Sequence, residues 1–436
     1  MFQRIVRGLE LTFILFILAL VLGYGVPSGS DETEKVRTYT RQIEFNYLSW
    51  MGNAALLKLR SASIDAPYIF DLSTQKQIVT GYLQLTQQIF EKEYLLEKVY
   101  ADAGITDKEL ASESLRAELA EMYARQSKLA PLAEAIVQGQ ISRVLAEVEL
   151  TVAGQPVPGV LYHVTPLPKA LIVSARDRIE QTANISVETE LTLDEMSALE
   201  TRVDKGLNVS SLVVNVGGVG VYPTMVMRSS DLNWILSTVA HEWIHNYLTL
   251  RPLGILYGET PELRTMNETA ASIAGNEIGA LAFERFYPEL ISASHPDPST
   301  LRLAQEGASL RTVSAPFGHP EPGDFLRPPF DFRAEMHETR VTADALLAGG
   351  KIDEAEAYME SRRLVFLQNG YLIRKLNQAY FSFYGAYADT PGGAAGEDPV
   401  GPAVRALRAQ SESLVDFINT ISWMTDFQQL KDKVSQ

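Results

Sequence analysis

The chain of 436 residues contains no cysteine and only 6 histidines. The absence of cysteine excludes disulfide bonds, thiolate zinc ligands and a cysteine nucleophile. It does not assign a compartment, because a protein without thiols is stable in reducing and in oxidising surroundings. Basic residues are also few, with 38 Lys and Arg against 54 Asp and Glu, which gives a net charge of −16. No basic patch offsets this acidic charge, so we expect no nucleic-acid partner.

Long apolar runs are scarce as well, and the main one lies at the N-terminus. Arg4 and Arg7 precede an apolar core over 11–22, shorter than the roughly 20 residues that cross a bilayer comfortably. Residues 1–30 are therefore expected to be a cleaved signal peptide or a short membrane anchor; the flanking arginines disfavour a buried helix. Because the positive flank stays inside, both leading interpretations place the protein outside the cytoplasm, membrane-anchored or secreted.

The full chain has ordinary globular composition, 46% apolar and 21% charged, and its length predicts two or three folded units. We expect an α+β protein with a helical N-terminal region over 31–147 and a core over 148–290. A Pro/Gly-rich connection and a helical C-terminal region follow over 291–436.

Local patterns place the elements within these regions. Apolar residues at helical spacing predict helices over 75–101, 107–129, 230–250, 265–287 and 364–388, the last after a helical hairpin broken at Gly349 and Gly350. Runs rich in β-branched residues predict strands at 171–175, 209–216 and 221–227. Gly217 to Gly220 lie between the last two strands and predict a hairpin turn or a bulged edge.

One short motif carries chemistry, the sequence HEWIH at 241–245. On a helix, His241 and His245 lie on one face about 6 Å apart, so both imidazoles can point at one metal ion. Zinc (Zn²⁺) suits such a pair. Glu242 lies about 100° round the helix, where it could act as general base towards a metal-bound water. The alternative, a structural histidine pair, is disfavoured because HExxH is rare by chance in a chain with so few histidines.

Zinc also needs a third protein ligand, and no third histidine follows nearby. The candidates are the glutamates after the motif: Glu259, Glu262, Glu268 and Glu277. We expect Glu268, because its helical face carries the small residues Ser272, Gly275 and Gly279, which allow close approach to the HExxH helix. Glu277 lies about 180° round that helix, and the first two fall in a turn-rich loop. The alternative is that Glu268 is a solvated or capping residue.

HEWIHNYL followed by NETAASIAGNEIG resembles the gluzincin class of zinc peptidases, in which HExxH and a glutamate on the next helix hold the metal. It is similar in particular to a bacterial family of predicted aminopeptidases with an HELAHQ-like and an NESFA-like helix. KLNQAYFSFYGAY at 375–387 adds to this similarity, which covers residues 200 to about 390. The chain departs from the pattern at Ser272, where several families have an Asp that orients the first histidine.

The resemblance implies a zincin-like metalloprotease core, in which a small mixed sheet accompanies the HExxH helix and the ligand helix. It further implies that the substrate adds to an edge strand, here 214–223 with Gly218, Val219 and Gly220, although a plain hairpin is an equal alternative. A donor to the oxyanion is also expected. Candidates are Tyr384 and Tyr387 by resemblance and His337 by chemistry, although residues 380–384 also suit an aromatic packing stripe. The other histidines, which lie among turn residues, are expected to be exposed: His163, His295 and His319.

The leading hypothesis is a membrane-associated, extracytoplasmic zinc metallopeptidase that cleaves peptide or protein substrates with Glu242 as base. Only the family resemblance supports aminopeptidase activity, and the sequence does not indicate an oligomeric state. The alternative is a non-catalytic, membrane-tethered scaffold or peptide-binding protein with a metalloprotease-like core. The enzyme is favoured because a purely structural zinc site would not require the glutamate of HExxH.

Overall fold

The computed structural model describes residues 31–61, 69–101, 105, 107–293, 330–384 and 399–435. The expected signal or anchor segment at 1–30 lies outside these residues, as do His295, His319 and Tyr387. The described chain is a mixed α+β protein, mostly helical, with two small sheets of three strands each. None of its helices combines the length and the apolar character that a bilayer crossing requires.

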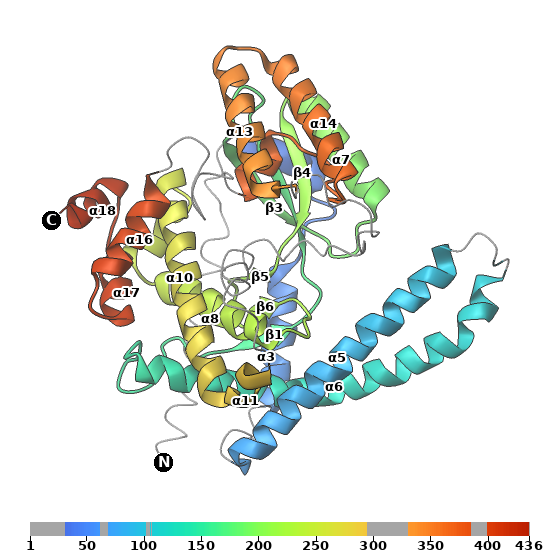
Figure 1. Ribbon diagram of the computed structural model, residues 1–436, viewed down its shortest axis with the longest axis vertical. Helices are drawn as coiled ribbons and strands as arrows, with labels where there is room; N and C mark the ends of the chain where they lie inside the picture. The colour runs from blue at the N-terminus through green and yellow to red at the C-terminus, as the bar shows by residue number, and fades with distance from the viewer. Residues whose placement is uncertain are drawn as a thin grey trace.

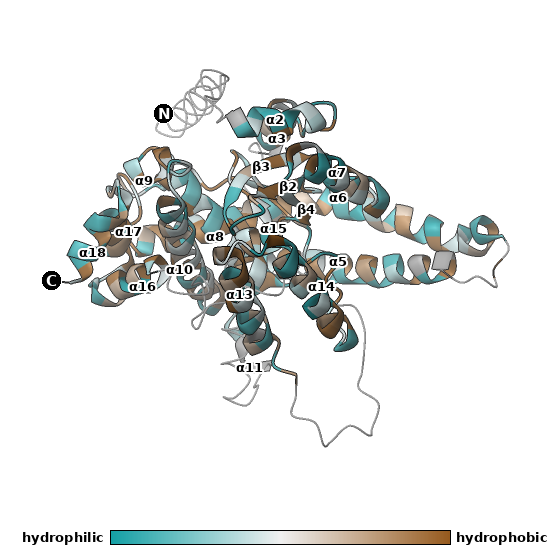
Figure 2. Ribbon diagram, turned by 90° about the horizontal axis from the view of Figure 1, so that it is seen from above, coloured by the Kyte–Doolittle hydropathy of each residue, from teal (hydrophilic) through white to brown (hydrophobic). Residues whose placement is uncertain are grey.

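The N-terminal region is helical, as expected. It consists of α2 (Asp31–Thr40), α3 (Tyr47–Ser61), α5 (Leu72–Ala101) and α6 (Lys108–Glu147). Helices α5 and α6 pack side by side and project from the molecule as a long arm (Figure 1; Figure 2). The sequence predicted that α6 ends near residue 129, but the helix continues through Pro131. Its second half is buried in the main core at Ile136, Val137 and Ile141, and this burial outweighs the cost of one proline.

The centre of the molecule is a pair of helices that pack along each other, α8 (Leu232–Leu248) and α10 (Pro261–Phe286). The short helix α9 (Pro252–Ile255) joins them, and α11 (Pro288–Ala293) follows. Asp231 caps α8 and Thr260 caps α10, each by accepting a backbone N–H of its first turn. The C-terminal helices cover α10 in Figure 1: α16 (Val400–Gln410), α17 (Leu414–Ser422) and α18 (Phe427–Val434).

The first sheet has the antiparallel order β3-β2-β4, from β2 (Lys169–Ser174), β3 (Gln181–Val187) and β4 (Ser210–Asn215). Alternate residues face opposite sides. Leu171 and Val173 pack with α2 and α7 (Leu193–Leu207), whereas Ala170 and Ile172 pack with α13 (Phe332–Ala348) and α15 (Gln378–Tyr384). Helix α14 (Ile352–Gln368) packs on α13. The sheet is therefore the middle layer of three.

The second sheet lies beside α8 and has the order β1-β6-β5. Strand β1 (Tyr162–Val164) runs parallel to β6 (Thr224–Val226), and β5 (Gly218–Val219) pairs antiparallel with β6. In the register of this pair, Gly218 lies opposite Val226 and Val219 opposite Met225. The glycine-rich turn thus contains a two-residue strand at the edge of the sheet.

The three predicted strands are confirmed as β2, β4 and β6, whereas β1, β3 and α7 were not expected. Helix α7 was missed although Thr192 and Glu195 form a capping box at its start. The helix predicted over 364–388 is wrong. Helix α14 ends at Gln368, because Gly370 adopts a positive φ of 86° that ends the helical turn, and α15 begins at Gln378.

The expectation that His163 is an exposed turn residue is also wrong. His163 lies in β1, and its Nδ1 is 3.1 Å from Oε1 of Glu134 on α6. The Glu134 side chain, 3% exposed, also pairs with Lys58 of α3 at 2.5 Å and accepts the N–H of Val164 at 2.8 Å. Burial acts to raise the pKa of Glu134, but Lys58 and His163 lower it overall. This buried ionised group joins α3, α6 and β1.

Candidate metal centre

The structure brings the three predicted metal-binding residues together between α8 and α10. His241 and His245 lie one turn apart on α8, with their Nε2 atoms 3.0 Å from each other. Oε2 of Glu268 on α10 lies 3.8 Å from Nε2 of His241 and 3.5 Å from Nε2 of His245. The ligand atoms of this cluster lie within 4.8 Å of one another, so the cluster could hold a metal ion.

Small residues on α10 allow this approach. A Cβ atom on Gly275 would lie 2.8 Å from the backbone of His241, and one on Gly279 would lie 2.7 Å from the backbone of Ser237. The close contact expected at these two glycines is therefore present. Ser272, which the sequence placed on the same face, is exposed instead. Ala271 and Ala274 are the buried small residues beside the glycines.

Each histidine has a partner that fixes its ring. Nδ1 of His245 lies 2.8 Å from Oδ1 of Asn267, whose amide nitrogen donates to the carbonyl of Leu253 at 3.3 Å. The ring of His241 makes a hydrogen bond with the backbone of Ala271. A backbone group thus orients the ring of His241. Such partners set which ring nitrogen is free to bind an ion.

The third residue of the cluster is fixed by Tyr257, whose hydroxyl donates to Oε1 of Glu268 at 2.5 Å. The Tyr257 ring also lies edge-on to His245, with centroids 6.4 Å apart. Sequence reasoning missed both Tyr257 and Asn267. Asn267 directly precedes Glu268, and this adjacency could have indicated it. Tyr257 follows the short helix α9, in a segment without periodicity, so no pattern pointed to it.

Glu242 lies outside the ligand set but beside it. The residue is 7% exposed, and burial raises the pKa of its carboxyl group to about 7. Its carboxylate faces the edge strand: a Cβ on Gly218 would lie 2.3 Å from Oε1, and one on Gly220 would lie 3.4 Å from Oε2. The glycines predicted to contact substrate therefore adjoin the predicted base, and side chains there would fill the space beside it.

The charges of the cluster are strongly coupled. Burial, together with the charge of His245, lowers the pKa of His241 to about 4. Burial also acts to lower the pKa of His245, but the carboxylate of Glu268 outweighs this effect and raises it to about 9. Burial acts to raise the pKa of Glu268, but the two histidines lower it well below its usual range. Without a metal, the proton therefore resides on His245, paired with the Glu268 carboxylate.

The remaining candidates lie elsewhere. Glu259 and Glu262 are exposed, and Glu277 pairs with Arg408 of α16 at 2.8 Å, on the side of α10 away from α8. His337 on α13 and Tyr384 on α15 belong to the helices that cover the first sheet. The Tyr384 ring lies 4.6 Å from that of Tyr380, which confirms the packing stripe. The role of His337 and Tyr384 as oxyanion donors stays a prediction.

The donor set fits a divalent metal ion that accepts nitrogen and oxygen ligands. Two imidazole nitrogens and one carboxylate oxygen converge, and each ligand is fixed by a hydrogen bond on its far side. The Glu268 side chain is 44% exposed, so solvent reaches the cluster from one side. No protein-family model, no curated protein and no solved structure matches the chain. The function is therefore inferred from the geometry of this cluster.

Proposed function

We propose that the chain is a gluzincin-type zinc metallopeptidase with a zincin-like core, which hydrolyses peptide bonds in a peptide or protein. The observation that carries the proposal is the position of Glu242. Its buried carboxylate lies beside the cluster of His241, His245 and Glu268, and beside the edge strand β5. Burying a carboxylate costs desolvation free energy. A metal site with a purely structural role does not require such a group outside its ligand set.

Zinc is the proposed ion, because it takes imidazole and carboxylate ligands and leaves a position open in catalytic sites. When bound, zinc would polarise the scissile carbonyl and activate a water molecule. Glu242 would take a proton from a water molecule as the oxygen of that water attacks the carbonyl carbon, and would pass the proton to the amine nitrogen as the C–N bond breaks. Its pKa of about 7 suits both transfers at neutral pH.

The edge strand β5 supplies the proposed substrate surface. One side of β5 pairs with β6, and the structure has no strand on its other side within the described residues. An extended peptide could add there through backbone hydrogen bonds. The absence of side chains at Gly218 and Gly220 would allow this peptide to approach Glu242 closely.

The test uses the full-length protein and its Glu242→Gln variant. We expect about one zinc per chain in both by elemental mass spectrometry, and loss of the metal in His241→Ala. Cleavage of a peptide library should fall about 10²–10⁴-fold in Glu242→Gln, because it lacks the base. Glu262→Gln, at an exposed glutamate of α10, is the matched control and should cleave like the wild type.

Two outcomes would contradict the enzyme. Equal cleavage by Glu242→Gln and wild type would exclude the proposed base. A wild-type protein that holds zinc and binds library peptides without cleaving them would support the alternative of a peptide-binding scaffold. The positions of the cleaved bonds would show whether the enzyme is an aminopeptidase, as the family resemblance implies, or an endopeptidase.

We also propose that the protein acts outside the cytoplasm and is associated with the membrane. The support is the charged and apolar pattern of residues 1–30. Reporter fusions after residue 30 and N-terminal sequencing of the mature protein test this proposal. Activity of a reporter that works only in the cytoplasm would contradict it.

A further inference from the structure

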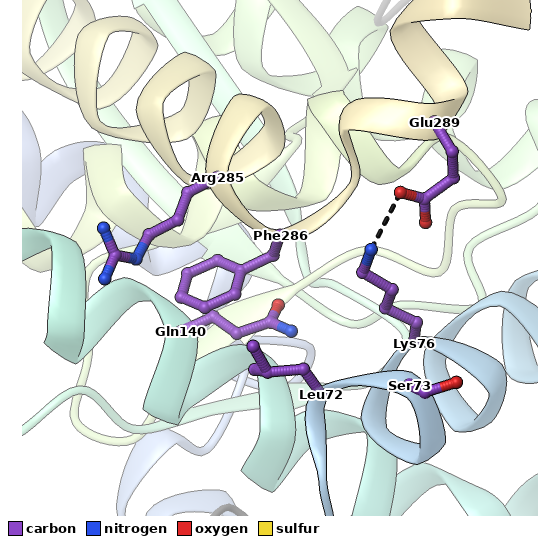
Figure 3. Close-up of a pocket in the computed structure, with 7 residues that line it drawn as sticks. All are labelled: Leu72, Ser73, Lys76, Gln140, Arg285, Phe286 and Glu289. Carbon is purple, nitrogen blue, oxygen red and sulfur yellow. Dashed lines mark hydrogen bonds and ion pairs between the residues drawn. The ribbon is translucent and has the colours of Figure 1, made fainter.

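A second site lies at the far end of α10 from the metal cluster. Glu268 and Arg285 are 17 residues apart on this helix, which corresponds to about 25 Å along its axis. Here a cavity of about 320 Å³ lies between α5, α6, α10 and α11 (Figure 3). Its lining includes Leu72, Lys76, Gln140, Arg285, Phe286 and Glu289. A cavity of this size is large enough for a small ligand.

Gln140 presents an unused donor to this cavity. The residue is 2% exposed, and its Oε1 accepts the hydroxyl of Tyr287 at 3.0 Å. Its amide nitrogen has no hydrogen-bond partner in the described part of the chain, and Figure 3 shows it directed between Leu72 and Lys76. This nitrogen is not one of the fully buried atoms without a partner, so it is open to the cavity and can donate to an acceptor oxygen of a ligand there.

The charge and shape of the lining restrict that ligand. Two cations, Lys76 and Arg285, line the cavity against one carboxylate, Glu289, which pairs with Lys76 at 2.8 Å. Arg285 pairs at 3.0 Å with Glu147, which is not part of the lining. Both cations are therefore already paired with a carboxylate, so the charges around the cavity balance. The ammonium of Lys76 still has N–H donors that Glu289 does not use, and together with the amide of Gln140 they favour a ligand with acceptor oxygens. Leu72 and Phe286 add an apolar wall beside the polar groups, which a bare inorganic ion would leave uncovered.

We propose that this cavity binds a small organic carboxylate that carries a short apolar group. One carboxylate oxygen accepts from the amide nitrogen of Gln140, and the negative charge lies near Lys76. The apolar group packs on Leu72 and Phe286. This site shares no residue with the metal cluster and does not depend on the peptidase proposal.

The probes are 3-methylbutanoate, its neutral amide and inorganic phosphate, titrated into the full-length protein by calorimetry. We expect the acid to bind at least about tenfold more tightly than the amide, since hydrogen bonds to charged groups are the stronger ones. The proposal would be overturned by equal binding of acid and amide, or by no binding of the acid. Phosphate binding as tight as that of the acid would indicate a site for any small anion, and would overturn the proposed contact of an apolar group with Leu72 and Phe286.

Variants locate the binding. Gln140→Glu keeps an oxygen for Tyr287 but replaces the donor with a repelling carboxylate, so affinity for the acid should fall at least about tenfold. Lys76→Met should weaken binding of the acid as well. If Gln140→Glu does not fold, the affinity of Lys76→Met tests the proposal. Lys92→Met is the matched control, because Lys92 lies on the same helix and pairs with Glu118 on the arm. Unchanged affinity in both cavity variants would overturn the proposal, whereas Glu242→Gln should bind like the wild type.

Discussion

Gly275 of α10 lies against the backbone of His241 on α8. A Cβ atom at Gly275 would be 2.8 Å from the nitrogen, Cα and Cβ of that histidine. Backbone atoms cannot move aside as the end of a flexible side chain can. Even the methyl group of an alanine at position 275 would therefore push the two helices apart. The distance between the helices, and with it the distance from Glu268 to the two histidines, therefore depends on this glycine.

We expect Gly275→Ala to destabilise the protein by about 1–3 kcal/mol, the usual cost of overpacking, and to weaken metal binding. Gly81→Ala on α5 is the control, because nothing lies within 4 Å of a Cβ there. That substitution should stabilise the protein by about 0.4–1 kcal/mol, since alanine restricts the unfolded chain. Urea unfolding of both variants measures the difference. A Gly275→Ala protein as stable as the wild type would contradict the close contact.

Asn267 orients His245, so its loss should weaken the metal site without removing a ligand. We expect Asn267→Ala to lower metal affinity about 10–100-fold, the usual effect of losing a residue that orients a ligand. Asn267→Asp keeps an acceptor for Nδ1 of His245 and should retain most of the affinity. Competition with a chromophoric chelator measures both variants. Equal losses in the two variants would indicate a general effect on folding.

Metal binding should release a proton. The pKa of His245 is raised to about 9, so its ring is protonated at neutral pH, whereas His241, with a pKa of about 4, is already neutral. Because the ion binds only the neutral ring, affinity should rise about tenfold per pH unit from pH 7 towards 9. Calorimetry in buffers of different ionisation enthalpy counts the proton. The Glu242→Gln variant should be used, because it removes the carboxyl group of Glu242, which itself titrates near pH 7. Affinity independent of pH would contradict the His245–Glu268 ion pair.

The two glycines beside Glu242 should differ in effect. A methyl group on Gly218 would overlap Oε1 of Glu242 at 2.3 Å, whereas one on Gly220 would meet Cβ of His245 at 3.3 Å. We expect Gly218→Ala to lower kcat about 10²-fold by displacing the base, with zinc content unchanged. Gly220→Ala should have a smaller effect. Peptide cleavage and zinc content are the measurements, and equal rates in both variants would argue against Glu242 as the base.

The part of the site that the sequence predicted depends on helical periodicity. His241 and His245 are four residues apart on α8, and Glu268 precedes Gly275 and Gly279 by seven and eleven residues on α10, spacings that place each set on one face of its helix. The helices α8 and α10 were predicted for the same reason. Periodicity did not predict that Ser272 is exposed, because the contact between two helices is set by their crossing as well as by spacing.

The remaining features depend on contacts that no local pattern records. Tyr257 reaches Glu268 from an irregular segment, and His163 pairs with Glu134, 29 residues away on another element. Strand β3 carries polar residues such as Asn184 in its middle, so its alternation was too weak to indicate a strand. Each of these features depends on tertiary packing, which local patterns in a single sequence do not predict.

The connection between α8 and α10 has a consequence for how the protein assembles. Glu268 follows His245 by 23 residues, and the two helices that carry them form a local hairpin around α9. Closing so short a loop costs little chain entropy, whereas the β1–β6 pairing joins residues 62 apart, Tyr162 and Thr224. Contacts that are close in sequence form fastest during folding. We therefore expect α8 and α10 to associate before the sheet that contains β5 forms. The three metal-binding residues would then come together before the proposed substrate-binding edge strand is in place.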